Sequence, residues 1–240
     1  MLAMTLSPDL DAKPEDYAGC GSSEEAEHAW DRRLRSASLK VLQGREHVFF
    51  EGDAKQNVYL VEKGTVCLYK TLPDGRRQIV DFAYSGDLIG LSSGADHAFS
   101  AQAITLTRVR CLHAASLHEA ARHDPCIGMH LYRALSDQLM SARDLLLTVG
   151  QRNATERLAA LLVALSRRNE RADGDPLQIV LPMTRADIAD FLSLTIETVS
   201  RTFTKLRVSG IIDLAHSSLV IVRDKTMLEQ LAAGELQSFR

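Results

Sequence analysis

Short apolar runs separated by glycine-containing turns mark the first half of the chain. They lie at residues 48–50, 58–61, 66–69, 79–82 and 101–112. The run at 66–69 is followed by Pro73, Asp74 and Gly75, whose residue types favour a hairpin turn. Short strands at this spacing predict an all-β sandwich or rolled barrel over residues 41–113.

Glycine becomes rare after residue 125, and a helical period follows over residues 126–150. Its apolar positions alternate in steps of three and four residues and are Tyr132, Leu135, Leu139, Ala142, Leu146 and Val149. This heptad seam predicts pairing with the same helix of a second copy in a parallel dimer. The alternative is a seam packed on the chain's own β-domain, and Leu145 and Leu147 widen the apolar face enough for both contacts. The seam loses its apolar residues at 150–153, which predicts a hinge.

Residues 181–210 carry the pattern of two short helices joined by a tight turn at Ser193 and Leu194. Thr184 is placed to cap the first helix, and Thr195 the second. The positions expected to face inward are Ile188, Ala189 and Leu192, then Val199, Phe203 and Leu206. This arrangement predicts a helix-turn-helix, and the apolar runs at 211–214 and 219–222 predict the hairpin of a winged helix.

The outer face of the second helix carries groups that can read base edges. Arg201 can donate two hydrogen bonds to guanine, Glu197 can accept one from cytosine, and Ser200 can serve either base edge. Groups suited to phosphate contacts surround them, namely Thr184, Arg185, Thr195, Thr198, Lys205 and Arg207. The alternative is a solvated ion pair of Glu197 with Arg201, worth about 0.3–0.5 kcal/mol. On a capped and packed helix we favour double-stranded DNA as the partner.

Composition and charge are those of an ordinary globular chain. The 240 residues are 45% hydrophobic and carry a net charge of −3. Residues 1–30 hold seven acids against one lysine and show no apolar periodicity, which predicts a flexible acidic tail. No apolar run approaches the ~18 residues of a membrane span. No secretory signal is visible either, so we expect a cytoplasmic protein without membrane contact.

The chain shows no motif of an enzyme. HExxH, GxSxG, the P-loop and the dinucleotide fingerprint do not occur. Asp187 and Asp190 could suggest acid–base chemistry, but we expect both on an exposed helix face. Four cysteines, Cys20, Cys67, Cys111 and Cys126, lie far apart without a CxxC pair. We therefore expect neither a disulfide framework nor a four-cysteine zinc site, and no catalytic activity.

Three strings connect the chain to a known family. They are Gly86-Asp87-Leu88-Ile89-Gly90, then Glu156 to Ala160 with Leu165 to Arg168, and Leu194 to Arg201. Over residues 38–230 the chain resembles the CRP/FNR superfamily of bacterial transcription regulators, and within it the FixK-like branch. Many relatives have glycine where this chain has Ser193, and a left-handed serine costs roughly 1–2 kcal/mol.

The resemblance implies a function. It implies a homodimer that binds a palindrome with TTGA(T)-type half-sites and recruits RNA polymerase, as an activator of genes for low-oxygen respiration or nitrogen metabolism. Base reading would fall to Glu197, Ser200 and Arg201. The loop of Leu72, Pro73, Asp74 and Gly75 matches a polymerase-contacting loop, with a plain hairpin turn as the alternative.

The positions that hold effectors in the family differ here. Members that bind a cyclic nucleotide have a glutamate and an Arg-Ser/Thr pair where this chain has Leu91 and Phe99-Ser100, so a buried phosphate would lack a counter-charge. An FNR-like cluster needs four thiolates, and only Cys20 and Cys111 match. Ala142 replaces the carboxylate that gates cluster-dependent dimers.

We therefore expect a constitutive dimer without cofactor or metal. The alternatives are the same fold gated by haem, NO or another small effector, redox sensing through Cys20 or Cys126, and a ligand-binding signalling module without DNA.

The expected fold class is α+β. An N-terminal β-roll, or double-stranded jelly-roll, would form the sensor domain, followed by a long dimerisation helix and a winged helix-turn-helix domain. The expected boundaries are 1–30 for the tail, 31–124 for the roll, 125–150 for the helix and 151–240 for the DNA-binding domain.

Overall fold

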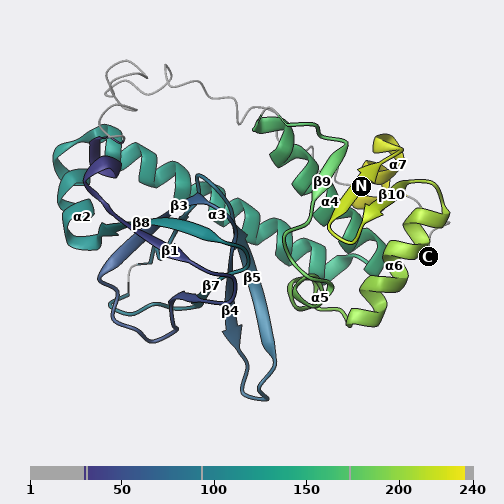
Figure 1. The fold of residues 1–240 in the computed structure, drawn as a ribbon, viewed down its shortest axis with the longest axis horizontal. Helices are drawn as coiled ribbons and strands as arrows, with labels where there is room; N and C mark the ends of the chain where they lie inside the picture. The colour runs from purple at the N-terminus through teal and green to yellow at the C-terminus, as the bar shows by residue number, and fades with distance from the viewer. Residues whose placement is uncertain (1–29, 31, 93, 173, 236–240) are drawn as a thin grey trace, which may run out of the picture.

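The computed structural model describes residues 30, 32–92, 94–172 and 174–235. Its N-terminal part folds into two antiparallel four-stranded sheets (Figure 1). One has the order β1 (Ser38–Leu42), β8 (Thr107–His113), β3 (Asn57–Lys63), β6 (Leu88–Ile89), and the other β2 (His47–Phe49), β7 (Ser100–Ala103), β4 (Val66–Thr71), β5 (Arg77–Ala83). Between them lies a core that includes Leu42, Val61, Val66, Ala101 and Val109. The predicted all-β domain is confirmed.

The apolar run at 101–112 was expected as one strand, and this is wrong. The run is divided between β7 and β8, which belong to different sheets. The crossing is held by threonines, because Thr105 Oγ1 accepts a hydrogen bond from the Thr65 N–H at 3.1 Å and Thr107 Oγ1 donates to the Thr65 carbonyl at 3.3 Å. A run that changes sheets cannot continue as one strand.

Three helices follow the roll. They are α2 (Ala114–His123), α3 (Pro125–Gln151) and α4 (Ala154–Arg171). α2 is not among the predicted elements, whereas α3 confirms the predicted long helix. The break between α3 and α4 also lies where the hinge was predicted. Asn153 caps α4 there, since its side chain accepts from the N–H groups of Thr155 and Glu156.

The heptad seam of α3 faces away from the chain's own roll. Exposed fractions along it are 61% for Tyr132, 47% for Leu135, 51% for Leu139 and 73% for Leu146. Ala142 is also exposed and Val149 is half-buried. α3 contacts the roll through other positions, including buried Ile127 and Gln138, whose side-chain amide donates to the Leu88 carbonyl at 2.6 Å. The alternative of a seam packed on the chain's own β-domain is therefore wrong.

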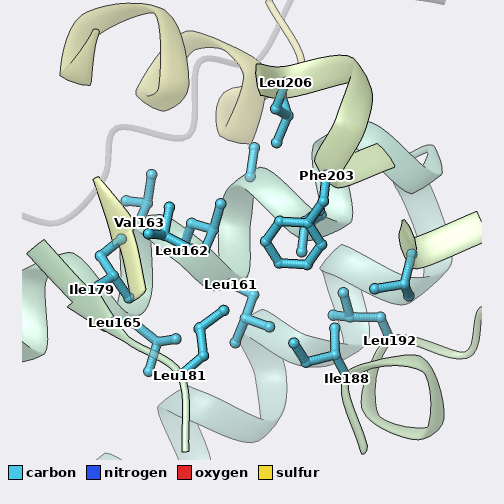
Figure 2. Packing of buried hydrophobic residues seen from close by; sticks show 14 of the residues in the cluster. Leu161, Leu162, Val163, Leu165, Ile179, Leu181, Ile188, Leu192, Phe203 and Leu206 are labelled. Atoms are coloured by element: carbon cyan, nitrogen blue, oxygen red, sulfur yellow. The ribbon is translucent and has the colours of Figure 1, made fainter. Parts of the chain in front are cut away.

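The C-terminal part combines three helices with a small sheet. The helices are α5 (Arg185–Leu192), α6 (Ile196–Val208) and α7 (Lys225–Ala233), and the sheet has the order β10 (Ile212–His216), β11 (Leu219–Val222), β9 (Gln178–Val180). Apolar side chains from α4, α5, α6 and β9 meet in its core (Figure 2). The predicted helix-turn-helix and hairpin are confirmed. The predicted acidic tail lies outside the described residues except for Trp30. This residue is buried, and its ring stacks on His130 with 4.1 Å between the ring centres.

Candidate DNA-binding surface

The first helix of the motif, α5, is capped as its sequence predicts. The Thr184 hydroxyl accepts a hydrogen bond from the Asp187 N–H at 3.1 Å, and the Asp187 carboxylate accepts one from the Thr184 N–H at 2.9 Å. The helix ends at Ser193, whose φ of 54° and ψ of 48° are left-handed. The expected left-handed serine is confirmed, and it turns the chain directly into α6.

The second helix, α6, is anchored by its apolar side. Thr195 caps it by accepting from the Thr198 N–H at 3.2 Å. Val199, Phe203 and Leu206 are each at most 2% exposed. Figure 2 shows Phe203 directed into the core beside α5 and α4. The rotation of α6 about its axis is therefore set by burial.

The opposite side of α6 carries the predicted base-reading residues. Glu197, Ser200 and Arg201 are all exposed. Hydrogen bonds from its own backbone N–H and from the Thr195 hydroxyl lower the pKa of Glu197, and the charge of Arg201 adds to this. Glu197 is therefore an anionic acceptor next to a guanidinium donor, which is the chemistry that a cytosine paired with guanine requires.

Most of the predicted phosphate-contacting residues surround this face. Thr184, Thr195, Lys205 and Arg207 are exposed and Thr198 is half-buried. Arg185 differs from the others, because its guanidinium carbon lies 3.4 Å from the centre of the Phe203 ring. Burial also lowers the pKa of Arg185. Its place beneath α6 favours a packing role over the expected phosphate contact.

Asp187 and Asp190 were expected on an exposed helix face, and this is wrong. Both form ion pairs with Arg77 of β5, and the Asp187 side chain is only 13% exposed. Burial by itself would raise the pKa of Asp187, but hydrogen bonds from Thr184 and the ion pair with Arg77 outweigh it and hold the pKa below its usual value. These carboxylates attach the motif to the roll, and no sequence spacing could show it because the partners are 110 and 113 residues apart.

Comparison with known proteins identifies the family. Residues 39–120 match the cyclic nucleotide-binding domain and residues 156–231 match the Crp-like helix-turn-helix domain. The nitrogen fixation regulation protein FixK of Bradyrhizobium diazoefficiens is 41% identical over 79% of this chain and 79% of its own length. The chain belongs to the Crp/FNR family.

Other family members agree in sequence and in structure. The transcriptional activatory protein AadR of Rhodopseudomonas palustris is 38% identical over 90% of this chain and 89% of its own length. The structure of FixK2 from Bradyrhizobium japonicum matches with a TM-score of 0.76 at 36% identity, covering 81% of this chain and 96% of that chain. The chain is thus a FixK-like transcription regulator, and its relatives are regulators rather than enzymes.

The roll of this Crp/FNR regulator is filled by its own side chains near the family's effector positions. His97 is 4% exposed and stacks on Phe49, with 3.7 Å between the ring centres. The chain approaches it closely at Gly90, where a Cβ would lie 3.1 Å from the imidazole. Leu91 is half-buried and Phe99 is exposed. Neither brings a charge that could bind a phosphate.

The cysteines and helices of this regulator bear on two further properties, metal binding and membrane contact. Burial raises the pKa of Cys67 to about 11, and its thiol donates to the Gln102 carbonyl at 3.5 Å. Cys20 lies outside the described residues. Over the described residues no three His, Cys, Asp or Glu side chains gather in a way that suits a metal ion. None of the described helices has the length and apolar character to span a membrane.

The loop at 72–75 is a tight hairpin between β4 and β5. The Gly75 N–H donates to the Leu72 carbonyl at 2.9 Å, and Gly75 has a φ of +82°. Asp74 pairs with Arg76 at 2.7 Å. The hairpin extends well away from the roll (Figure 1). It is therefore accessible to a large partner, with Pro73 exposed on it.

Proposed function

We propose that this regulator binds, as a homodimer, to a palindrome with TTGA(T)-type half-sites and activates transcription from it. The main support is that α6 has one buried side and one exposed side. Val199, Phe203 and Leu206 are buried, and Glu197, Ser200 and Arg201 therefore point outward together. Arg201 donating to a guanine and Glu197 accepting from its paired cytosine suit the G·C pair of such a half-site.

The homodimer would form along the exposed seam of α3. Side chains such as Tyr132, Leu139 and Leu146 are more than half exposed in one chain. A contiguous apolar stripe of this kind is typical of a surface that a partner covers. The heptad spacing fits a second copy of the same helix.

RNA polymerase is the further partner in this proposal, and the protruding hairpin with Leu72, Pro73, Asp74 and Gly75 is its contact. The names of the relatives, nitrogen fixation regulation protein and fumarate and nitrate reduction regulatory protein, support target genes in nitrogen metabolism and low-oxygen respiration. Because the proposed partner is DNA, we infer that the protein works in the cytoplasm.

We also propose that the regulator acts without a cofactor. His97 and Phe49 occupy the interior of the roll, and the effector positions Leu91 and Phe99 are uncharged. An absorption spectrum of the purified protein tests this, because a Soret band would overturn it. Light scattering tests the dimer: the metal-free wild type should be dimeric, and Leu139→Glu should make it monomeric. Val208→Glu, at a position 79% exposed outside the seam, is the matched control that should stay dimeric.

DNA binding is tested by selecting sites from a random pool and measuring affinity by fluorescence anisotropy. Arg201→Ala should lose about 1–3 kcal/mol per half-site and relax the preference at the guanine. Lys205→Ala, the control on the same helix, should weaken all sequences alike and reduce the salt dependence. If Arg201→Ala keeps the wild-type preference at every position, α6 does not read the bases as proposed.

A further inference from the structure

One strand of the roll holds both ends of the first helix of the motif. Arg77 at the start of β5 forms an ion pair with Asp187 through Nη2, and its Nε lies 3.0 Å from the Asp190 carboxylate. The next residue, Gln78, donates from its side-chain amide to the Asp190 carbonyl at 2.6 Å and accepts from the Ser193 hydroxyl at 3.4 Å. We call Arg77, Gln78, Asp187 and Asp190 the clasp.

An apolar contact continues the clasp along the same strand. The rings of Phe82 in β5 and Phe191 in α5 lie 5.0 Å apart. Ile79 of β5 is fully buried and belongs to the same core as Ile188 and Leu192. We call the part of the chain from α4 to α7 the DNA-binding unit. This unit and the roll thus share one hydrophobic core, so the clasp is part of a packed interface.

A second ion pair attaches α4 to the end of β5. Arg168 lies 3.0 Å from the Asp87 carboxylate and donates to the Ser85 carbonyl at 3.2 Å. Its guanidinium carbon also lies 4.5 Å from the centre of the Tyr84 ring. The roll therefore contacts the DNA-binding unit at two places along its surface.

The covalent link between α3 and the DNA-binding unit is a two-residue break in the helix. Arg152 and Asn153 interrupt the helix with extended backbone, at ψ of 148° and 172°. Such a break between two elements is a place where φ and ψ can change and alter the angle between the elements. The orientation of α6 relative to α3 then depends on contacts with β5.

We infer that Arg77 is a positioning residue for DNA reading, which holds the DNA-binding unit at one angle to the dimerisation helix. The inference rests on the proposed dimeric binding to a palindrome. Half-sites of such an operator lie one helical turn apart, about 34–36 Å. Two recognition helices reach both half-sites only if each unit keeps its angle, so the clasp selects the spacing between half-sites while α6 selects the bases.

Removal of Arg77 should leave the motif itself folded. Asp187 keeps its capping hydrogen bonds with Thr184 at 2.9 and 3.1 Å. The apolar contacts of Ile188 and Leu192 with the rest of the core are also retained. A defect of Arg77→Ala would therefore lie in orientation, and circular dichroism with thermal unfolding would show that the variant is folded.

The experiment compares full-length proteins on three palindromes that differ only in half-site spacing and on a duplex with a single half-site. The wild type should prefer one spacing strongly. Arg77→Ala should bind that palindrome about tenfold more weakly, because a second site contributes through effective concentration. It should bind the other spacings with smaller losses and the single half-site with unchanged affinity. Arg77→Lys, which can pair with one carboxylate at a time, should lie between.

Arg76→Ala is the matched control. Arg76 is the neighbouring arginine, its side chain is 78% exposed, and it pairs with Asp74 in the hairpin. Its loss should leave the spacing preference unchanged. If Arg77→Ala keeps the wild-type ratios among the three spacings, or weakens the single half-site as much as the palindrome, the positioning role is wrong. A wild type that binds no palindrome better than a single half-site would instead refute dimeric operator binding, and the inference with it.

Discussion

Ser193 offers a direct test of the turn between the two helices of the motif. It is a left-handed residue with a side chain, and its φ and ψ of 54° and 48° join α5 to α6. Its Cβ is therefore strained, whereas its hydroxyl is exposed and lies 3.4 Å from Gln78 Oε1. Ser193→Gly removes both groups, and Ser193→Ala removes only the hydroxyl.

The expected gain in stability is the difference between two backbone effects. Relief of the left-handed Cβ is worth roughly 1–2 kcal/mol. The added freedom of glycine in the unfolded chain opposes this gain in stability by roughly 0.5–1 kcal/mol. A hydrogen bond of 3.4 Å at an exposed position contributes little. Ser193→Gly should therefore raise the free energy of unfolding of the C-terminal unit by about 0.5–1 kcal/mol.

Thermal unfolding followed by circular dichroism measures this difference. At about 2–4 °C per kcal/mol for a chain of this size, Ser193→Gly should raise the midpoint by roughly 1–4 °C. Ser193→Ala keeps the strained Cβ and should unfold at or just below the wild-type midpoint. A midpoint of Ser193→Gly at or below that of Ser193→Ala would refute the reasoning. The base preference in DNA binding should be the same for all three proteins.

Three further predictions concern buried groups. Phe203→Ala should lower the stability of the C-terminal unit by about 3–5 kcal/mol in urea unfolding, because the ring is 2% exposed and fills the core beneath α6; a loss below about 1 kcal/mol would contradict this packing. Burial raises the pKa of Asp81 to about 6, so its ionisation costs stability as the pH rises from its unfolded pKa, about 4, through 6. Asp81→Asn should then be more stable than wild type by about 3 kcal/mol at pH 8, with the difference vanishing near pH 4. Cys67 is 1% exposed with a pKa of about 11, so mass spectrometry should find it unmodified by an alkylating reagent in the native protein and modified in urea.

Local patterns in the sequence were sufficient for most of the elements and for the exposed face of α6 that carries Glu197, Ser200 and Arg201. The period of 3.6 residues that buries Val199 and Phe203 must also turn Glu197 and Arg201 outward, so the geometry of a single helix decides the face. The caps at Thr184 and Thr195 likewise depend on contacts three residues away. Such features are encoded within one or two helical turns and need no knowledge of the rest of the chain.

Local sequence patterns could not predict the contacts between distant parts of the chain. The division of 101–112 between two sheets depends on which neighbouring strand each half meets. Helix α2 has no side-chain cap and buries only Ala114 and Leu117, so no local capping signal marks where it begins.

The sequence by itself determined that α6 has an apolar side and an exposed side with Glu197, Ser200 and Arg201, and that α3 carries an apolar seam. Only the tertiary structure decided that this seam lies away from the roll, that Arg185 packs on Phe203, and that Asp187 and Asp190 pair with Arg77. The physical reason is the distance along the sequence over which each feature is decided. Periodicity and capping are local, whereas a half-buried charge finds its partner only after the roll and the helix-turn-helix have come together.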